Sequence, residues 1–284
     1  MDLNRDTAEI FVPDGLPEAQ ALARTTHLGI GAHQDDLEFM ALHGILECFQ
    51  NGEKWFTGVT ATDGRGSSRV NEYADYTDDQ MQKVRRHEQN KAAVVGEYGA
   101  MIQLDHPSSV AKSPSDPALV ADLIAIFRAT QPEVVYTHNL ADKHETHIGV
   151  AIAVVQALRL LSPEWRPQAL YGCEVWRNLD WMLDEDKTVF DVSARENVVM
   201  ALMGVFDSQI SGGKRYDLAT AGRKRSNATY LASHASDRAR MLEYAMDLTP
   251  LIENPGVEIA GYVRSFIDRF SEDVGERIVR RLGR

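Results

Sequence analysis

Short apolar runs alternate with stretches of helical periodicity through the first two thirds of this chain. Between the runs, apolar residues recur every three or four positions, as they do along one face of a helix. Strands that alternate with helices in this way form a parallel sheet, with the helices packed on its two faces. The sequence therefore predicts an α/β fold with a Rossmann-like, mostly parallel sheet flanked by helices. The predicted strands lie at about residues 27–32, 54–61, 101–104, 133–137 and 170–175.

The two ends of the chain follow this pattern less closely. Residues 1–26 are polar and rich in turn-forming residues, so we predict a leader segment draped on the domain. From about residue 176 onward the alternation weakens, although helical stretches remain. We predict a single α/β domain over residues 1–284, with a core of about 27–210 and an irregular C-terminal extension of about 211–284 that covers the functional site.

Composition narrows the class of partner. With a formal net charge of −12, the chain lacks the basic surface that binding to nucleic acid or to an anionic membrane requires. Its most apolar run, residues 148–155, is too short to cross a bilayer. Cys48 and Cys173 lie in apolar stretches and are predicted to be buried free thiols, and no signal segment is visible, so we expect a cytoplasmic protein. The expected partner is a small-molecule substrate, and the sheet edges leave room for a homo-oligomer.

His33, Asp35 and Asp36 directly follow the first predicted strand, at the point where it turns into a helix. Ligands of open α/β sheets collect at the carboxyl ends of the strands, so the position and the residue types both indicate a site. An aspartate at such a junction also commonly caps the helix, which explains one carboxylate but not two with a histidine beside them. Read alone, this cluster leaves capping and function equally open.

A second pair of histidines, His144 and His147, opens the helix after the fourth strand. The i, i+3 spacing places both imidazoles on one face of the first turn, although two capping or surface histidines would show the same spacing. Because parallel strands end at the same edge of a sheet, this pair and the first cluster converge. Two histidines and a carboxylate suit a catalytic zinc ion with an open position for water, and they also suit ferrous iron.

The two motifs resemble those of the PIG-L (LmbE-like) N-acetylglucosaminyl deacetylase family. Ala32-His33-Gln34-Asp35-Asp36-Leu37-Glu38 is similar to the family's Ala-His-Pro-Asp-Asp-Glu motif. Asp142-x-His144-x-x-His147 is similar to its later Asp-x-His-x-Asp-His motif. Thr62-Asp63-Gly64 and Arg85-x-x-Glu88 also lie where the family has comparable residues, so the resemblance spans roughly residues 27–210.

The resemblance implies a role for each motif residue. His33, Asp36 and His147 would bind Zn²⁺, with Fe²⁺ as the alternative metal. Asp35 would be the general base, and His144 would stabilise the tetrahedral intermediate. The implied reaction is the metal-dependent hydrolysis of an N-acetyl amide on an amino sugar or sugar conjugate, which releases acetate and a free amine.

Two positions depart from the family's pattern. Gln34 stands in place of a proline, which makes the turn less rigid without removing a ligand. Thr146 stands where the family has an aspartate, so a supporting carboxylate would have to come from Asp142 or Glu145.

Five further residues are weaker substrate-binding candidates. Arg65 and Arg69 lie in a Gly/Ser-rich loop after the second strand and either hold sugar hydroxyls or are solvated. Asp63 is either a turn residue or part of a pocket wall. His138 and Asn139 end the fourth strand and either line the pocket or cap the loop.

Two other functions fit parts of the pattern. Gly29-x-Gly31 suggests a nucleotide-using Rossmann-fold enzyme, but no third glycine opens the helix, and two aspartates would repel a pyrophosphate. A non-catalytic metal- or sugar-binding module would keep the metal ligands but would have no need for Asp35. The sequence therefore favours the deacetylase.

Overall fold

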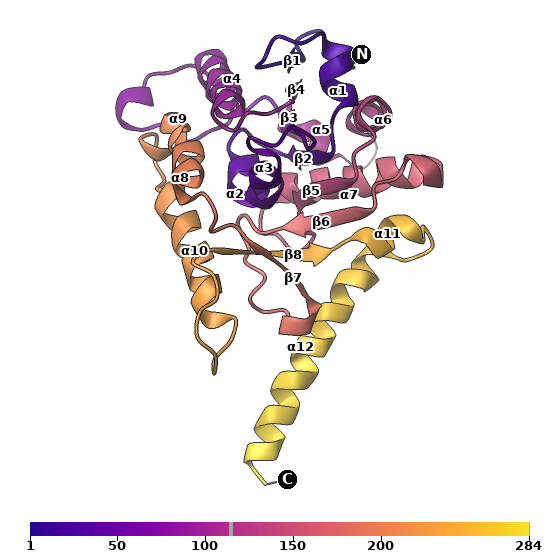
Figure 1. Cartoon of the computed structure of the whole chain (residues 1–284), viewed down its shortest axis with the longest axis vertical. Coiled ribbons are helices and arrows are strands. Elements are labelled where there is room, and N and C mark those ends of the chain that lie inside the picture. The colour runs from indigo at the N-terminus through magenta and orange to yellow at the C-terminus, as the bar shows by residue number, and fades with distance from the viewer. Residues whose placement is uncertain (114–115, 284) are drawn as a thin grey trace.

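The computed structural model describes residues 1–113 and 116–283, and its centre is an eight-stranded sheet (Figure 1). The strand order is β1-β4-β3-β2-β5-β6-β8-β7. The five inner strands from β4 to β6 pair in parallel, as the alternating sequence pattern predicts. They are β2 (His27–Gly31), β3 (Phe56–Thr62), β4 (Ala100–His106), β5 (Val134–His138) and β6 (Ala169–Cys173).

The outer strands run antiparallel to their inner neighbours. β1 (Glu9–Phe11) pairs with β4, so residues 1–26 contribute a strand and the helix α1 (Glu18–Ala23) rather than only a leader. On the other side, β8 (Leu242–Asp247) pairs with β6, and β7 (Lys187–Asp191) pairs with β8. The chain beyond residue 211 therefore adds a strand to the same sheet and is more regular than its sequence indicates.

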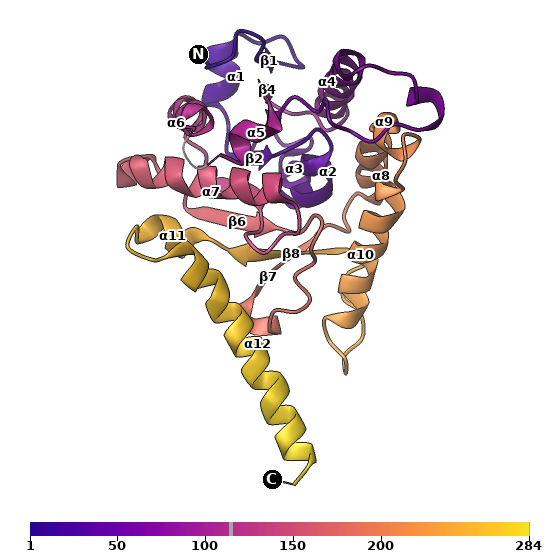
Figure 2. The same ribbon diagram turned by 180° about the vertical axis from the view of Figure 1, so that it is seen from behind.

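Helices cover both faces of the sheet and give two apolar cores. One core lies under α1, α6 (Ala118–Thr130), α7 (Glu145–Leu160) and α11 (Thr249–Glu253). The other lies under α3 (Leu42–Cys48), α4 (Asp78–Val95), α8 (Glu196–Gly204) and α10 (Tyr216–Tyr230), together with α2 (Asp36–Met40). The two opposite views show these two helical layers with the sheet between them (Figures 1 and 2). The short helices are η1 (Asn71–Tyr73), α5 (Ser108–Ala111), η2 (Pro163–Trp165), η3 (Asp184–Asp186) and α9 (Asp207–Ile210).

The helix predicted after the first strand is divided in two. Ala41, between α2 and α3, has φ −114° and ψ 25°, so the helical path changes direction there.

α4 begins at a capping box. The Thr77 side chain accepts from the Gln80 backbone N–H, and the Gln80 side chain accepts from the Thr77 backbone N–H. The two cysteines are buried free thiols, as predicted.

Gly149 of α7 allows α5 to lie directly against that helix. A Cβ at position 149 would come within 2.0 Å of the Ala111 carbonyl oxygen, which is a backbone atom. α5 and the residue after it carry Ser108 and Lys112, which line a cavity of about 860 Å³. The absence of a side chain at residue 149 therefore positions one wall of that cavity.

The last helix, α12 (Ile259–Arg281), extends away from the rest of the molecule in both views (Figures 1 and 2). Its first turns pack on the core through Tyr262, Val263 and Phe266. No helix among the described residues combines the length and the apolar character needed to cross a membrane.

Candidate metal centre and active-site cavity

The two histidine motifs meet at the point where the strand order reverses. β2 and β5 are adjacent and parallel, but the chain continues from β2 toward β3 on one side and from β5 toward β6 on the other. The loops that leave the carboxyl ends of such a pair diverge and leave a crevice between them. His33 and Asp36 follow β2, and His144 and His147 follow β5, so all four lie at this crevice.

A strained turn carries the two aspartates. Asp35 has φ 101°, in the left-handed region that a residue with a Cβ rarely adopts, and its side chain makes no capping bond to α2. The Asp36 carboxylate does not cap the helix either. Its Oδ2 accepts a hydrogen bond of 2.7 Å from the backbone N–H of His33. Helix capping therefore does not explain this pair of carboxylates.

Three donor groups from the two motifs form a compact triangle, to which Asp36 contributes both carboxylate oxygens. His33 Nδ1 lies 3.3 Å from Asp36 Oδ2 and 3.2 Å from His147 Nε2, and His147 Nε2 lies 3.5 Å from Asp36 Oδ1. Ligands at about 2.0–2.1 Å from a tetrahedral zinc ion are roughly 3.4 Å apart. The predicted ligand set therefore has the spacing that a four-coordinate metal ion requires.

The electrostatics of this triangle also suit a cation. Burial lowers the pKa of His33 to about 4, so its imidazole is neutral at pH 7 and keeps a free lone pair. Burial alone would raise the pKa of Asp36, but His147, His138 and His33 around it hold that pKa well below its usual range. The site therefore presents an ionised carboxylate and a neutral imidazole to the same point.

Asp142 supports the second motif from behind. Its Oδ2 lies 3.3 Å from His147 Nδ1 and accepts from the Trp176 backbone N–H, while its Oδ1 accepts from the backbone N–H of His144. A carboxylate on the far nitrogen of a metal-binding histidine fixes the tautomer and orientation of the ring. Asp142 thus provides the supporting carboxylate that Thr146 lacks.

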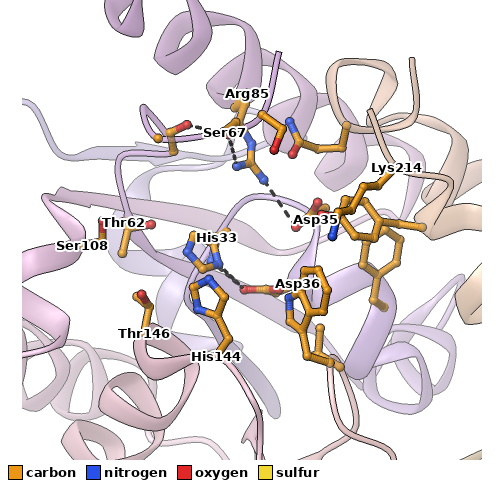
Figure 3. A pocket seen from close by; sticks show the side chains of 18 of the residues that line it. His33, Asp35, Asp36, Thr62, Ser67, Arg85, Ser108, His144, Thr146 and Lys214 are labelled. Atoms are coloured by element: carbon orange, nitrogen blue, oxygen red, sulfur yellow. Dashed lines mark hydrogen bonds and ion pairs between the residues drawn. The ribbon is translucent and has the colours of Figure 1, made fainter. Parts of the chain in front are cut away.

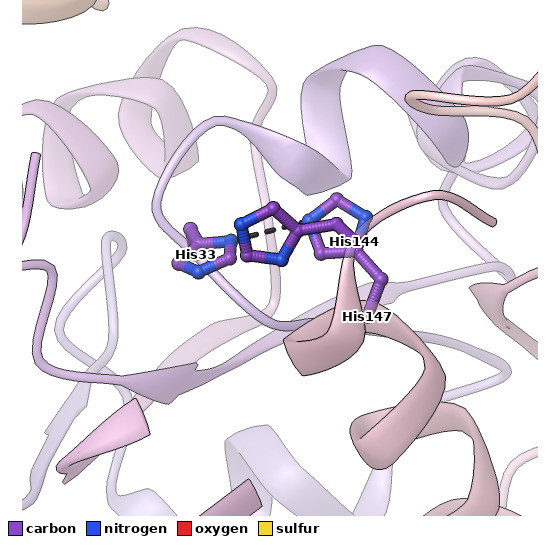
Figure 4. A group of neighbouring side chains, drawn as sticks. All are labelled: His33, His144 and His147. Carbon is purple, nitrogen blue, oxygen red and sulfur yellow. Dashed lines mark hydrogen bonds between the residues drawn. The ribbon is translucent and has the colours of Figure 1, made fainter. Parts of the chain in front are cut away.

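His144 stands above this group, at the cavity surface. Its ring centroid lies 5.0 Å from that of His33 and 4.6 Å from that of His147 (Figure 4). Its Nδ1 is buried and has no hydrogen-bond partner, and burial lowers the pKa of the ring. A neutral imidazole keeps one N–H, so His144 can donate a hydrogen bond into the cavity.

Asp35 faces the cavity beside the triangle but is not part of it. Its Oδ1 lies 3.4 Å from Arg85 Nη2, and Arg85 Nη1 donates to Ser67 Oγ at 2.5 Å (Figure 3). Arg85 Nη2 also donates to the Gln34 carbonyl. Burial raises the pKa of Asp35 well above its usual range, and Arg85 partly offsets this effect. A carboxyl group with a raised pKa next to a metal position has the properties of a proton carrier.

Gln34 joins three strand ends. Its Nε2 donates to the Thr62 carbonyl at 3.1 Å and to Gln103 Oε1 at 3.3 Å, so it connects the loop after β2 to β3 and β4. Its own Oε1 is buried without a hydrogen-bond partner, and a Cβ added at Gly64 would come within 2.4 Å of this oxygen. These side-chain bonds hold the turn that the family holds with a proline.

These groups open into a cavity of about 860 Å³. The motif residues, Asp63 and the Ser67–Ser68 loop form one side. The opposite wall comes from the later chain, where Lys214 Nζ lies 4.4 Å from the centroid of the Trp176 ring. This wall includes Trp176, Gln209, Lys214, Arg215, Tyr216 and Arg223. Residues 209–223 therefore cover the site, as the sequence predicts for part of the C-terminal extension.

Four of the weaker candidates do not line this cavity among the described residues. Arg65 pairs with Asp79, and Arg69 pairs with Asp78, both at the start of α4. His138 and Asn139 are fully buried. Of the five weaker candidates, Asp63 contributes to the cavity wall and the other four lie outside its lining among the described residues. Substrate binding by Asp63 stays a prediction.

His138 and Asn139 have structural contacts instead. His138 Nε2 accepts from the backbone N–H of Ala32 at 2.9 Å, and its ring stacks on His147 with centroids 3.8 Å apart. The His138 ring lies close to Asp36 and His147, but the lone pair on its Nε2 already accepts the backbone N–H of Ala32.

Asn139 donates to the Cys173 carbonyl and accepts from the backbone N–H of Ala141. These bonds cap the loop after β5.

The opposite wall has no motif in the sequence. Trp176 and Tyr216 line it, but an aromatic residue outside a motif is as typical of a core as of a pocket. They lie far along the chain from both motifs, and their position depends on how α10 packs across α2 and α8. No local spacing could have identified them.

The comparisons with known proteins agree with this geometry. Residues 28–158 match the family model described as PIG-L: GlcNAc-PI de-N-acetylase. Among curated proteins, the comparison gave no match.

Solved structures of similar fold span most of the chain. The N,N'-diacetylchitobiose deacetylase from Pyrococcus horikoshii has a TM-score of 0.62 at 15% identity, over 81% of this chain and 86% of that one. The 4-carboxy-2-hydroxymuconate hydratase from Pseudomonas putida has a TM-score of 0.60 at 16% identity, over 79% and 96%. A conserved protein from Thermus thermophilus has a TM-score of 0.59 at 19% identity, over 82% and 99%. At these identities the likeness is one of fold. The matched family model covers residues 28–158 and with them both histidine motifs.

Proposed function

We propose that this protein is a zinc-dependent hydrolase that removes the acetyl group from an N-acetyl amide on an amino sugar or sugar conjugate. The observation that carries the proposal is the division of labour between two adjacent aspartates. Asp36 belongs to a triangle of donor atoms 3.2–3.5 Å apart, whereas Asp35 faces the same cavity and pairs with Arg85. The match to the PIG-L family model gives independent support.

The donor set fits a divalent ion. His33, Asp36 and His147 offer two imidazole nitrogens and one carboxylate, and three protein ligands leave a fourth position open toward the cavity. Ferrous iron accepts the same set, so the metal used in the cell is a separate question from the site. A divalent ion held there would polarise the amide carbonyl and lower the pKa of a water molecule toward neutrality.

The protein's own groups supply the proton transfers. Asp35, oriented by Arg85, takes a proton from the attacking water and later delivers it to the departing amine. His144 donates its remaining N–H to the carbonyl oxygen as negative charge develops there. Similar donors elsewhere contribute about 3–4 kcal/mol to transition-state stabilisation. Because burial lowers the pKa of His144, this donor acts as a neutral imidazole.

The remaining cavity suits a sugar ring. Trp176 and Tyr216 present aromatic surface with their ring centroids 5.8 Å apart, and Asp63, Ser67 and Ser68 offer polar atoms on the opposite side. A pyranose ring has an apolar face for the aromatic wall and hydroxyl groups for the polar one. We propose that the sugar lies between these walls, with its N-acetyl group toward Asp35.

Fold likeness alone does not select this reaction, because a hydratase shares the fold at a similar TM-score. The deciding experiment is a screen for acetate release from N-acetylated mono- and oligosaccharides, with and without zinc. A hydratase assay on unsaturated carboxylic acids runs in parallel. We expect acetate release that EDTA abolishes and zinc restores. Activity that survives complete removal of metal, or hydration without acetate release, would contradict the proposal.

Replacing the proposed base tests its role separately from metal binding. We expect Asp35→Asn to keep stoichiometric zinc and to lower kcat about 10²–10⁴-fold, the range typical of general acid–base catalysis. Metal content by mass spectrometry and steady-state kinetics measure the two effects. Loss of the metal from this variant would show that Asp35 is a ligand and not the base.

A further inference from the structure

α12 has a free half that the rest of the fold does not explain. Up to Arg269, which pairs with Asp186 of η3, the helix is held by the body of the molecule. From Phe270 onward, the described residues form hydrogen bonds and ion pairs only within the helix itself. Figures 1 and 2 show this half projecting beyond every other element. A three-turn helix without tertiary contacts is marginal in water, so a partner surface is expected to stabilise it.

One face of this free half is apolar and exposed. At 100° per residue, Ile267 and four apolar side chains of the free half lie within about a third of the helix circumference, and exposed Val279 lies beside this arc. Their exposed fractions range from 39% for Phe270 and Val274 to 65% for Leu282. The stripe consists of Ile267, Phe270, Val274, Ile278 and Leu282. Apolar side chains that recur at steps of three and four residues are typical of a helix that packs against another helix.

From Phe270 onward, the charges beside the stripe are separated by sign. Glu272 and Asp273 follow Asp268 in the middle of the helix, and Arg277, Arg280 and Arg281 lie near its end, whereas Glu276 is on the face opposite the stripe. The acidic turn η3 (Asp184–Asp186) lies beside the docked part of the helix, next to Arg269. A helix with this distribution is complementary to an antiparallel copy of itself, because each basic end then lies beside the acidic middle and η3 of the other copy. A parallel copy would place like charges together.

We propose that this stripe is the contact surface for a second copy of the chain, paired antiparallel about a two-fold axis that passes near Val274. A two-fold contact requires a surface that is complementary to itself, and the charge distribution satisfies this requirement. An anionic membrane fits less well, because acidic side chains flank the stripe. The free half spans roughly 18 Å, so the interface is smaller than a standard one, and we expect dimerisation to depend on protein concentration.

The dimer leaves the active-site cavity open. No described residue of α12 lines the cavity, so association and catalysis are separable. The inference therefore does not depend on the proposed function.

Sedimentation velocity across the micromolar range tests the contact. We expect a monomer–dimer equilibrium for the full chain, and a monomer at every concentration for the double variant Val274→Asp/Ile278→Asp. Glu276→Ala, on the opposite face of the helix, is the matched control and should dimerise like the unaltered protein. Circular dichroism and thermal unfolding establish that each variant is folded. A full chain that stays monomeric, or a dimer that persists in the double variant, would overturn the proposal.

Disulfide trapping tests the orientation. Ile267→Cys protein mixed with Ile278→Cys protein should form a mixed disulfide dimer faster than either forms one with itself. The native Cys48 and Cys173 are buried and do not compete. Disulfides only between identical variants would indicate parallel pairing and contradict the antiparallel arrangement. Binding of a monomeric full chain to phosphatidylserine vesicles would instead assign the stripe to a membrane.

Discussion

At the scale of single residues, the centre of this molecule is a pair of adjacent aspartates with opposite surroundings. Three histidine rings surround Asp36 and hold its pKa well below the usual range, although burial opposes this. Asp35 has one cation, Arg85, and burial raises its pKa. Two carboxyl groups whose pKa values are pushed apart are suited to different tasks. The left-handed backbone at Asp35 is what directs the two side chains into these separate environments.

The contact between Asp142 and His147 leads to a prediction about metal affinity. We expect Asp142→Asn to weaken zinc binding about 10–100-fold, because the amide cannot orient and polarise the His147 ring as a carboxylate does. Glu145→Gln is the matched control: Glu145 is the neighbouring carboxylate of the same motif, but it is exposed. Competition with a chromogenic chelator measures both affinities. Equal affinities in the two variants would remove Asp142 from the site.

The local motifs carried most of what could be predicted about the site. His33, Asp36, His144 and His147 come together because short segments after parallel strands share a sheet edge, although metal binding itself stays a prediction. Ion pairs with residues outside their own loop determine where the side chains of the other candidates lie. Arg65 and Arg69 are drawn to the acidic start of α4, and no pattern within their own loop reveals those partners.

At the scale of elements, the contact between α5 and α7 depends on a single missing side chain. A Cβ at Gly149 would overlap the Ala111 carbonyl oxygen, and a backbone atom cannot move aside as a flexible side chain can. We expect Gly149→Ala to lower the free energy of unfolding by about 1–3 kcal/mol. Urea denaturation measures this change.

A second helical glycine provides the control for that experiment. Gly222 lies in α10, where an added Cβ would meet no atom within 4 Å. We expect Gly222→Ala to raise the free energy of unfolding by about 0.5–1 kcal/mol, because alanine favours the helix and loses less entropy on folding. A destabilisation of the same size in both variants would show that helix propensity, and not the α5 contact, governs position 149.

The inner strands of the sheet were predictable, and the outer strands were not. The five inner strands form apolar runs because helices cover them on both faces. β1 has only three residues, and β8 reaches its partner β6 after nearly seventy residues of intervening chain, so neither has a strong local signal. The break at Ala41 within the predicted helix likewise depends on packing against the sheet and not on a glycine or proline.

At the scale of the whole molecule, we expect acid stability to depend on a buried histidine far from the candidate metal centre. Burial lowers the pKa of His27 from about 6.5 to about 4, with Lys54 and His43 adding to the effect and Glu47 opposing it. Between these values the unfolded chain binds a proton that the folded protein does not. Stability from this group is therefore complete above the unfolded pKa and is lost as the pH falls from about 6.5 toward 4.

Removing the titrating ring should flatten this dependence. Between about pH 7.5 and pH 5, we expect the unaltered protein to lose about 2 kcal/mol more unfolding free energy than His27→Gln does. Urea denaturation of both proteins at both pH values, with a chelator present so that metal release does not contribute, gives the four free energies needed. Equal losses would show that His27 is not the responsible group.

The bonds of Gln34 have a consequence for how this sequence can change over generations. Gln34 fills the space above Gly64 and donates to Gln103, so any larger residue at 64 would collide with it, and an apolar residue at 103 would take away one of its acceptors. A proline at position 34 would remove the need for an amide at 103. Gly64 would stay constrained, because its φ of +69° and the Arg85 Cδ atom, 3.1 Å from an added Cβ, also disfavour a side chain there. We therefore expect homologues with glutamine at 34 to keep an amide at 103, and proline-bearing homologues to vary at 103. The departure from the family's motif is then one member of a linked pair of positions.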